Sequence, residues 1–157
     1  MTILKTGALC VLLNAIALTA FSQDHSKRPP LTEPNYNKAK LFADLPQKFK
    51  IDIQSFESLL DLPVGDGVNM PLTGNVRYQG IVVSKSDGQD PNVKSVVIKS
   101  KNRLGSTFSF ARIRNTDGSY KYSGRILSLN HSDAFELQRE NGEYVLTKKH
   151  LYDIFSE

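Results

Sequence analysis

Cysteine is nearly absent from this chain of 157 residues, which contains one, Cys10, close to its start. That cysteine lies in an apolar run that we expect to be removed, so the mature chain would contain none. A chain without cysteine forms no disulfide, no thiolate metal site and no cysteine nucleophile. The stability of the mature chain must then come from packing, and about 135 residues can bury enough surface for this.

A long hydrophobic segment is also lacking. The longest apolar stretch, residues 7–20, is shorter than the roughly 20 residues that a membrane-spanning helix needs. It follows Lys5 and leads to the small residues Ala20 and Ser22, which place the expected cut before Gln23. A basic start, a short apolar centre and small residues at the exit are typical of a secretory signal peptide. We therefore expect a signal peptide over residues 1–22, a secreted or periplasmic location, and no transmembrane segment in the mature chain.

Histidine is scarce, and one of the three histidines has a position that could matter. Cleavage before Gln23 would make His25 the third residue of the mature chain. A free amine, two backbone amides and an imidazole at position three can bind Cu(II) or Ni(II) in a square plane. Coincidence in a polar tail is the alternative interpretation, and cyclisation of Gln23 at the new N-terminus would remove the amine ligand. We predict no other cofactor.

Three motifs that would indicate a zinc, phosphate or calcium site are missing too. The sequence has no His-Glu-x-x-His zinc motif, no phosphate-binding loop and no twelve-residue calcium loop. Residues 130–133 read Asn-His-Ser-Asp and so contain the three residue types of a hydrolase triad. Adjacent residues on a tight turn cannot point at one another as that mechanism requires. We interpret this segment as a solvated turn whose Ser or Asp bonds its own backbone, and we keep a small hydrolase as a further alternative function.

The segment that follows the expected signal peptide differs from the rest of the chain. Residues 23–40 are polar, contain three prolines and show neither helical nor strand periodicity. Proline fixes a backbone dihedral and removes a hydrogen-bond donor, so regular structure is disfavoured there. We predict a flexible linker over residues 23–40 and a single folded domain over residues 41–157.

The start of the domain carries two overlapping patterns. Phe49, Ile51 and Ile53 alternate, which suggests a strand. From Ile53 onward the apolar residues have helical spacing instead, and Asp52 is available as an N-cap. We favour a short helix over Ile53–Asp61, ended by the proline and glycine that follow.

From Val68 onward, short runs rich in Val, Ile, Phe and Tyr are separated by turn residues. The runs are VNMPL, VRYQGIVVS, VKSVVIKS, STFSFARIR, YKYSGRILSL, AFELQRE and EYVLTKK, and the separators include Gly74-Asn75, Asp87-Gly88, Asp117-Gly118 and Asn141-Gly142. Asp-Gly and Asn-Gly accept the positive φ angles that tight hairpin turns need. This pattern predicts an all-β fold, an antiparallel meander of six to seven strands closed as a barrel or folded as a sandwich.

Two further details of the expected fold can be predicted from a few residues. Gly80 and Gly124 lie inside expected strands, where glycine marks a bulge or sharp coiling. At the end of the chain, Leu151, Ile154 and Phe155 share one helical face, which predicts a closing turn of helix.

Positive charge is concentrated in the middle of the chain. Residues 94–125 contain eight Lys or Arg and one acid, whereas residues 133–157 contain six acids and three Lys or Arg. Aromatic residues are interleaved with these cations on neighbouring expected strands, and an aromatic platform beside cations suits anionic or stacked ligands. The candidate binding residues are Lys99, Lys101, Arg103, Arg112, Arg114, Tyr120, Tyr122 and Arg125.

The same segment has a purely structural interpretation. Phe108 and Phe110 would point into the core, and strand alternation would leave the cations on the outer face as ordinary solubilising charge. Tyr120 and Tyr122 suit either interpretation, because tyrosine tolerates a half-wet site.

The stretch from Leu41 to the end resembles small secreted proteins of unknown function from Bacteroidetes-type bacteria. The resembling pieces are LFADLPQKFKI, VRYQGIVVS followed by SVVIKS, YKYSGRILSLNHSDAFEL and GEYVLTKK. The stretch is also similar to β-rich prodomains of secreted zinc metallopeptidases. The resemblance implies a free-standing, non-catalytic relative and carries over no functional residue.

Together these observations favour an exported, non-enzymatic binding module. We expect its partner to be another secreted protein, which it would bind as a prodomain-like inhibitor. The alternative is an anionic polymer, namely a polysaccharide, an envelope lipid or extracellular DNA, bound through the basic aromatic strands.

Overall fold

The computed structural model describes residues 37–86, 88 and 90–155. The expected signal peptide, the expected cut before Gln23, the copper-site hypothesis at His25 and most of the expected linker lie outside these residues. Those predictions therefore stay predictions. Within the described part, none of the helices combines the length and the apolar character that crossing a membrane requires.

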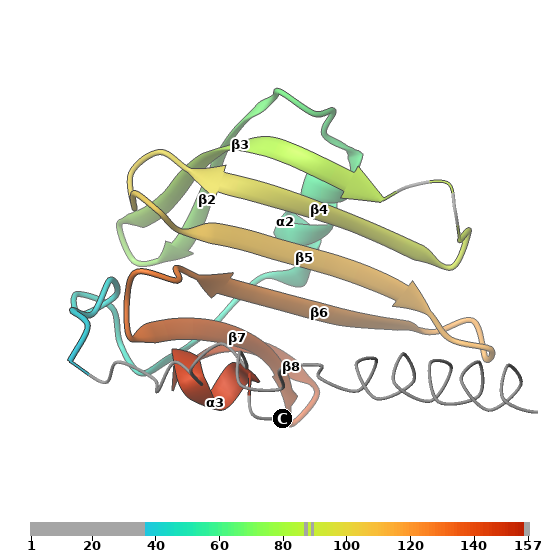
Figure 1. The fold of residues 1–157 in the computed structure, drawn as a ribbon. Coiled ribbons are helices and arrows are strands. Elements are labelled where there is room, and N and C mark those ends of the chain that lie inside the picture. Colours follow the sequence, from blue (N-terminus) through green and yellow to red (C-terminus); the bar gives the residue numbers. More distant parts are fainter. Residues whose placement is uncertain (1–36, 87, 89, 156–157) are drawn as a thin grey trace, which may run out of the picture. The chain divides into compact units, whose positions relative to one another are not determined.

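Eight antiparallel strands form one curled sheet, a half-barrel, in the order β1-β8-β7-β6-β5-β4-β3-β2 (Figure 1). The strands are β1 (Lys48–Lys50), β2 (Gly67–Thr73), β3 (Val76–Ser86), β4 (Val93–Ser100), β5 (Thr107–Arg114), β6 (Tyr120–Leu127), β7 (Asp133–Glu140) and β8 (Glu143–His150). The helical elements are α2 (Ile53–Glu57), the 3-10 helix η1 (Ser58–Asp61) and α3 (Leu151–Phe155). The prediction of an all-β antiparallel meander is confirmed.

The one strand beyond the expected seven, β1, lies in the region where the sequence carried two patterns. Both patterns form, one after the other: β1 pairs with β8, with Phe49 opposite Leu146, and α2 follows at once. The Asp52 carboxylate accepts a 3.1 Å hydrogen bond from the Gln54 amide, as expected of an N-cap. The α2–η1 segment therefore links β1 to β2, the two edges of the sheet.

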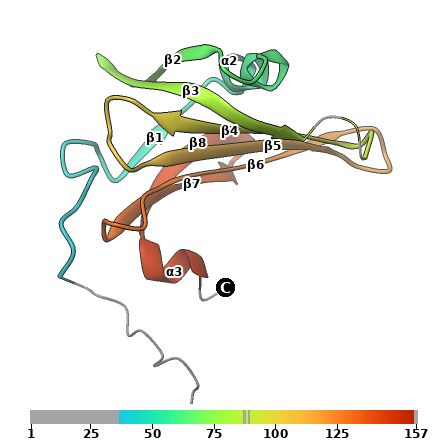
Figure 2. The ribbon, with the colours of Figure 1, turned by 45° about the horizontal axis from the view of Figure 1, so that its top comes forward.

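The core lies between the concave face of the sheet and the α2–η1 segment. Phe56 of α2 is 2 % exposed and meets Phe108 and Phe110 edge-on, with ring centroids 5.5 and 5.7 Å away. Both β5 phenylalanines are buried, so the prediction that they point into the core is confirmed. Figure 2 shows α2 and α3 on opposite sides of the sheet.

The β7–β8 hairpin has the backbone angles that its turn residues predict. Asn141 and Gly142, the two residues between β7 and β8, have φ angles of 49° and 86°, as a type I′ turn requires. Gly80 marks a close approach, since a Cβ there would lie 2.6 Å from the Lys99 carbonyl oxygen. The register shifts of β2 and β3 lie elsewhere, between Pro71 and Thr73 and between Val82 and Ser84.

The segment before β1 is held by charged side chains. Asp133, which is 2 % exposed, accepts hydrogen bonds from the amides of Leu41 (2.6 Å) and Phe42 (3.0 Å). The interpretation of residues 130–133 as a solvated turn bonding its own backbone is therefore wrong at Asp133. The reason is that Leu41 and Phe42 have no strand partner, and buried amides need an acceptor. Lys148 Nζ serves the same segment by donating to the carbonyls of Phe42 and Leu45, each at 2.6 Å.

Candidate functional site

One end of the concave face, beside the β5–β6 turn, is lined by polar and aromatic side chains. Strand alternation places Phe108, Phe110, Arg112 and Arg114 on the same face, because each is two positions from the next. The expectation that alternation would put these arginines on the outer face is therefore wrong. The two phenylalanines are covered by α2, and the two arginines continue the same face beyond it.

Three side chains meet around one carboxylate at this end. Arg112 Nη1 lies 3.2 Å from Glu57 Oε1, and the Tyr122 hydroxyl donates to the same oxygen at 2.6 Å. The Arg112 guanidinium also lies over the Tyr120 ring, 4.6 Å from its centroid. The Tyr144 ring meets Tyr122 edge-on at 5.3 Å. We call Glu57, Arg112, Tyr120, Tyr122 and Tyr144 the tyrosine–arginine cluster.

The cluster is joined to the core by stacked rings. Phe110 and Tyr122 are parallel within 7°, with centroids 5.9 Å apart. On the other side, the Arg139 guanidinium lies 5.9 Å from the centroid of Tyr144. Packing against Phe110 and Arg139 therefore fixes the rings of Tyr122 and Tyr144, while Tyr120 is the ring exposed to solvent.

The cluster is accessible enough to meet a ligand. Tyr120 is 43 % exposed, and the side chains of Arg112 and Glu57 are 26 % and 30 % exposed. Burial, and then the hydrogen bond to Glu57, raise the pKa of Tyr122 to about 12. Tyr122 is therefore a protonated donor throughout the neutral range.

Charge at this end is positive but modest. Lys94 is opposite Arg112 in the register and lies 3.6 Å from Asp61. Four cations lie on this part of the concave face, namely Lys94, Arg112, Arg114 and Arg139, with two acids, Glu57 and Asp61. Four positive charges less two negative charges leave a net charge of about two on this surface.

The structure brings together half of the candidate binding residues: Arg112, Arg114, Tyr120 and Tyr122. The others lie elsewhere. Lys99 is on the convex face, opposite Thr107, and Arg125 is on the same face with Arg125 Nη2 3.0 Å from Glu136. Lys101 and Arg103 belong to the β4–β5 loop, at the other end of the strands.

The Arg103 side chain is largely buried and bonds to other parts of the protein instead of facing solvent. Its side chain is 12 % exposed and makes two hydrogen bonds to Asp44, at 3.0 and 2.6 Å. A third bond, of 2.9 Å, goes to the carbonyl of Leu41. Arg103 therefore helps to hold the segment before β1.

Sequence reasoning missed five residues of this surface, namely Glu57, Asp61, Lys94, Arg139 and Tyr144. Tyr144 lies two positions before buried Leu146, and Arg139 two positions after buried Leu137, so alternation could have placed both on the concave face. Lys94 could have been placed in the same way. No local pattern brings Glu57 to Arg112, since that contact depends on where α2 packs.

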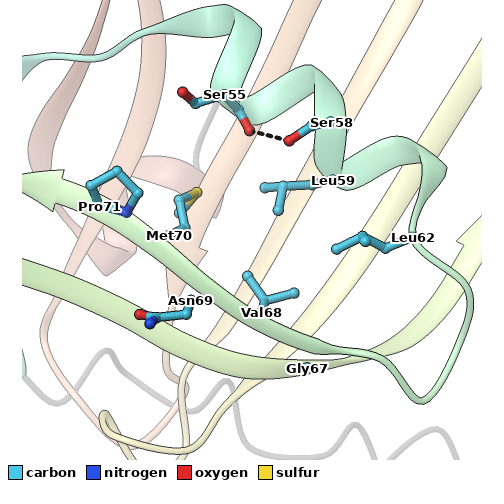
Figure 3. A pocket seen from close by; sticks show the side chains of 9 residues that line it. All are labelled: Ser55, Ser58, Leu59, Leu62, Gly67, Val68, Asn69, Met70 and Pro71. Carbon is cyan, nitrogen blue, oxygen red and sulfur yellow. Dashed lines mark hydrogen bonds between the residues drawn. The ribbon is translucent and has the colours of Figure 1, made fainter.

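A second candidate is a hollow of about 230 Å³ between η1 and the edge strand β2 (Figure 3). It is lined by Ser55, Ser58, Leu59, Leu62, Gly67, Val68, Asn69, Met70 and Pro71, none of which is charged. The exposed edge beside it is protected, because Arg77 donates to the Asn69 carbonyl at 2.7 Å and Pro71 has no amide hydrogen. This hollow therefore offers a ligand fewer directional contacts than the cluster does.

Among the described residues, no group of three or more His, Cys, Asp or Glu side chains is arranged to hold a metal ion. Comparison with known proteins adds no further site. No family model matches the chain, and no curated protein and no solved structure matches it either. The class that fold and site define is thus an all-β half-barrel with a tyrosine–arginine cluster on its concave face.

Proposed function

We propose that the protein is an exported, non-enzymatic binding module that holds an acidic polysaccharide on its tyrosine–arginine cluster. The observation that carries this proposal is the convergence of Arg112 and Tyr122 on the Glu57 carboxylate. Charge-assisted bonds of this kind are about twice as strong as neutral ones. The same donors suit the carboxylate of an acidic sugar that enters beside Glu57.

The aromatic rings support a sugar as the rest of the ligand. Tyr120 exposes 43 % of its surface, and its ring is held in place by Arg112 on one side. Tyrosine offers an apolar ring face together with a polar hydroxyl, which suits a ring that carries hydroxyl groups. Binding sites commonly combine such faces with a few well-placed polar groups.

The modest charge of the surface favours an acidic polysaccharide held by specific contacts over a nucleic acid held mainly by overall charge. Proteins that bind nucleic acids neutralise many phosphates, and that electrostatic term supplies most of their non-specific affinity. Here four cations stand beside two acids. A sugar carboxylate that Arg112 and Tyr122 hold directly needs fewer surrounding cations than such non-specific binding does.

A prodomain-like inhibitor of a secreted protein receives less support. An inhibitor of this kind would bind its target by pairing an exposed strand edge with it or by inserting a segment into it. The β2 edge is protected by Arg77 and Pro71. No other contact described above points to a protein partner.

Calorimetric titration of the full chain with polygalacturonate, neutral dextran and single-stranded DNA tests the proposal. We expect polygalacturonate to bind, with an affinity that falls as salt rises, and dextran and DNA to bind at least about tenfold more weakly. Arg112→Ala should weaken polygalacturonate binding about tenfold or more, the size expected for a lost charged hydrogen bond. Lys121→Ala, which removes a cation from the convex face, is the matched control and should change it less than about twofold.

Two outcomes would contradict the proposal. One is equal weakening by Arg112→Ala and Lys121→Ala, which would mean that only overall charge matters. The other is tighter binding of the DNA than of polygalacturonate, which would assign the surface to nucleic acid instead.

A further inference from the structure

The end of the sheet remote from the cluster carries two apolar loop tips. Leu104 in the β4–β5 loop is 77 % exposed, and Leu129 in the β6–β7 loop is 64 % exposed. These are the most exposed large hydrophobic side chains of the described residues. Both loops lie at the same end of the sheet (Figure 1).

The two loops lie against each other. A Cβ on Gly105, the residue after Leu104, would lie 3.4 Å from Ser128 Oγ and 3.7 Å from Asn130 Nδ2. Ser128 and Asn130 are the residues on either side of Leu129. The two leucines therefore project from touching loops and can meet one surface together.

Lysines surround the two tips. Lys38 Nζ donates to the Leu129 carbonyl at 2.7 Å, and the Ser132 amide donates to the Ala39 carbonyl at 3.2 Å. Residues 38–40 therefore run beside the β6–β7 loop and bring exposed Lys40 to it. Lys101, also exposed, precedes Leu104 in its loop.

The acids near these lysines already have other partners. Asp44 is bound by Arg103 at 2.6 Å, and buried Asp133 accepts the amides of Leu41 and Phe42. Among the described residues, Lys38, Lys40 and Lys101 form no ion pair, so their positive charge beside the leucines is not neutralised. We call Leu104, Leu129 and these three lysines the leucine–lysine end.

We propose that the leucine–lysine end docks onto an anionic lipid surface. The leucines would enter the boundary between headgroups and acyl chains, and the lysines would reach the phosphates while their stems lie along the apolar layer. A protein interface fits less well, because its centre is typically a packed patch rich in aromatic residues rather than two separate tips. Docking by this end leaves the tyrosine–arginine cluster, at the opposite end of β5, open to its ligand.

The chain contains no tryptophan, so a single introduced tryptophan reports on its own position. The test uses the full chain as Leu104→Trp, Leu129→Trp and, as the matched control, Val64→Trp, which replaces an apolar residue 61 % exposed between η1 and β2. Each is mixed with phosphatidylglycerol or phosphatidylcholine vesicles. We expect a blue-shifted emission, quenched by brominated lipid, for Leu104→Trp and Leu129→Trp with phosphatidylglycerol, and no change for Val64→Trp.

The electrostatic part is tested in the Leu104→Trp background. Lys40→Gln with Lys101→Gln should weaken the apparent partition into phosphatidylglycerol by roughly 25-fold at low salt, about fivefold for each lysine. Added salt should weaken the parent in the same direction. The two reporters replace exposed residues, so loss of folding does not complicate the comparison.

Three results would overturn the inference. The first is an emission shift for Val64→Trp equal to those of the two leucine variants. The second is an equal shift with phosphatidylcholine that survives the double lysine change. The third is a shift that grows with protein concentration in the absence of lipid, which would assign the end to contact between copies of the chain.

Discussion

Tyr122 donates a 2.6 Å hydrogen bond to Glu57, so this bond joins β6 to the last residue of α2 on the concave face. Because Arg112 lies beside the same carboxylate, the contact fixes three elements at one point.

The pKa of Tyr122, raised to about 12 by burial and then by Glu57, makes stability depend on alkaline pH. The unfolded chain releases the proton near pH 10, whereas the folded chain retains it to about pH 12. Stability from the neutral hydroxyl is therefore complete below about pH 10 and is lost as the pH rises toward 12. Urea unfolding across this range should show a smaller loss of unfolding free energy for Tyr122→Phe than for the parent. Identical losses would contradict the assignment.

Glu57 lies beside the position proposed for the ligand carboxylate and competes with it for Arg112 and Tyr122. Glu57→Gln removes this internal competitor but leaves an oxygen that can accept from Tyr122. We expect polygalacturonate to bind the variant more tightly, by roughly three- to tenfold, since a like charge beside the site is gone. Calorimetry measures the change, and Asp44→Asn, which alters an acid at the other end, is the control. Weaker binding by Glu57→Gln would mean that Glu57 assists the ligand instead of competing with it.

The close approach of β3 and β4 at Gly80 predicts a sharp difference between two glycines. A Cβ at Gly80 would lie 2.6 Å from both Ile98 Cγ2 and the Lys99 carbonyl oxygen, while at Gly67 nothing lies within 4 Å. Gly80→Ala should lower the free energy of unfolding by about 2–4 kcal/mol through overpacking and strand displacement. Gly67→Ala should change it by less than about 1 kcal/mol. Denaturant unfolding checks both, and equal effects would refute the steric explanation.

The buried carboxylate of Asp133 predicts that the segment before β1 depends on it. Asp133→Ala leaves the amides of Leu41 and Phe42 without their acceptor and should cost about 2–4 kcal/mol. Glu143→Ala, at a surface ion pair with Lys50, should cost at most about 0.5 kcal/mol. Hydrogen exchange at Leu41 and Phe42 should quicken in the first variant alone. Unchanged exchange there would show that other contacts hold the segment.

Seven of the eight strands could be predicted from sequence because each forms with its neighbour in the chain. Alternating apolar residues and turns such as Asn141-Gly142 specify such hairpins locally. The pairing of β1 with β8 could not be read in this way, since Phe49 meets Leu146 from the far end of the domain. The burial of Asp133 was unpredictable for the same reason, because its partners lie some ninety residues away.

The cluster was predictable only in part. The basic, aromatic composition of β5 and β6 correctly pointed to Arg112, Tyr120 and Tyr122 lying together. The same composition also selected Arg125, which alternation puts on the opposite face. Composition does not distinguish the two faces of a strand, whereas counting positions from buried Phe110 on β5 and buried Ile126 on β6 does. Glu57 depends on the packing of Phe56 against β5, which no local pattern contains.

The pairing of the first strand with the last has a consequence for how the chain is made. A ribosome delivers Lys48–Lys50 well before Glu143–His150, so β1 is without its neighbour until β8 has been made. Local hairpins can assemble in the meantime, since contacts between near neighbours form fastest. Phe49 stays uncovered during that interval and exposes an apolar surface of the kind that holding chaperones bind. A stalled chain that ends before residue 143 would keep that need permanently.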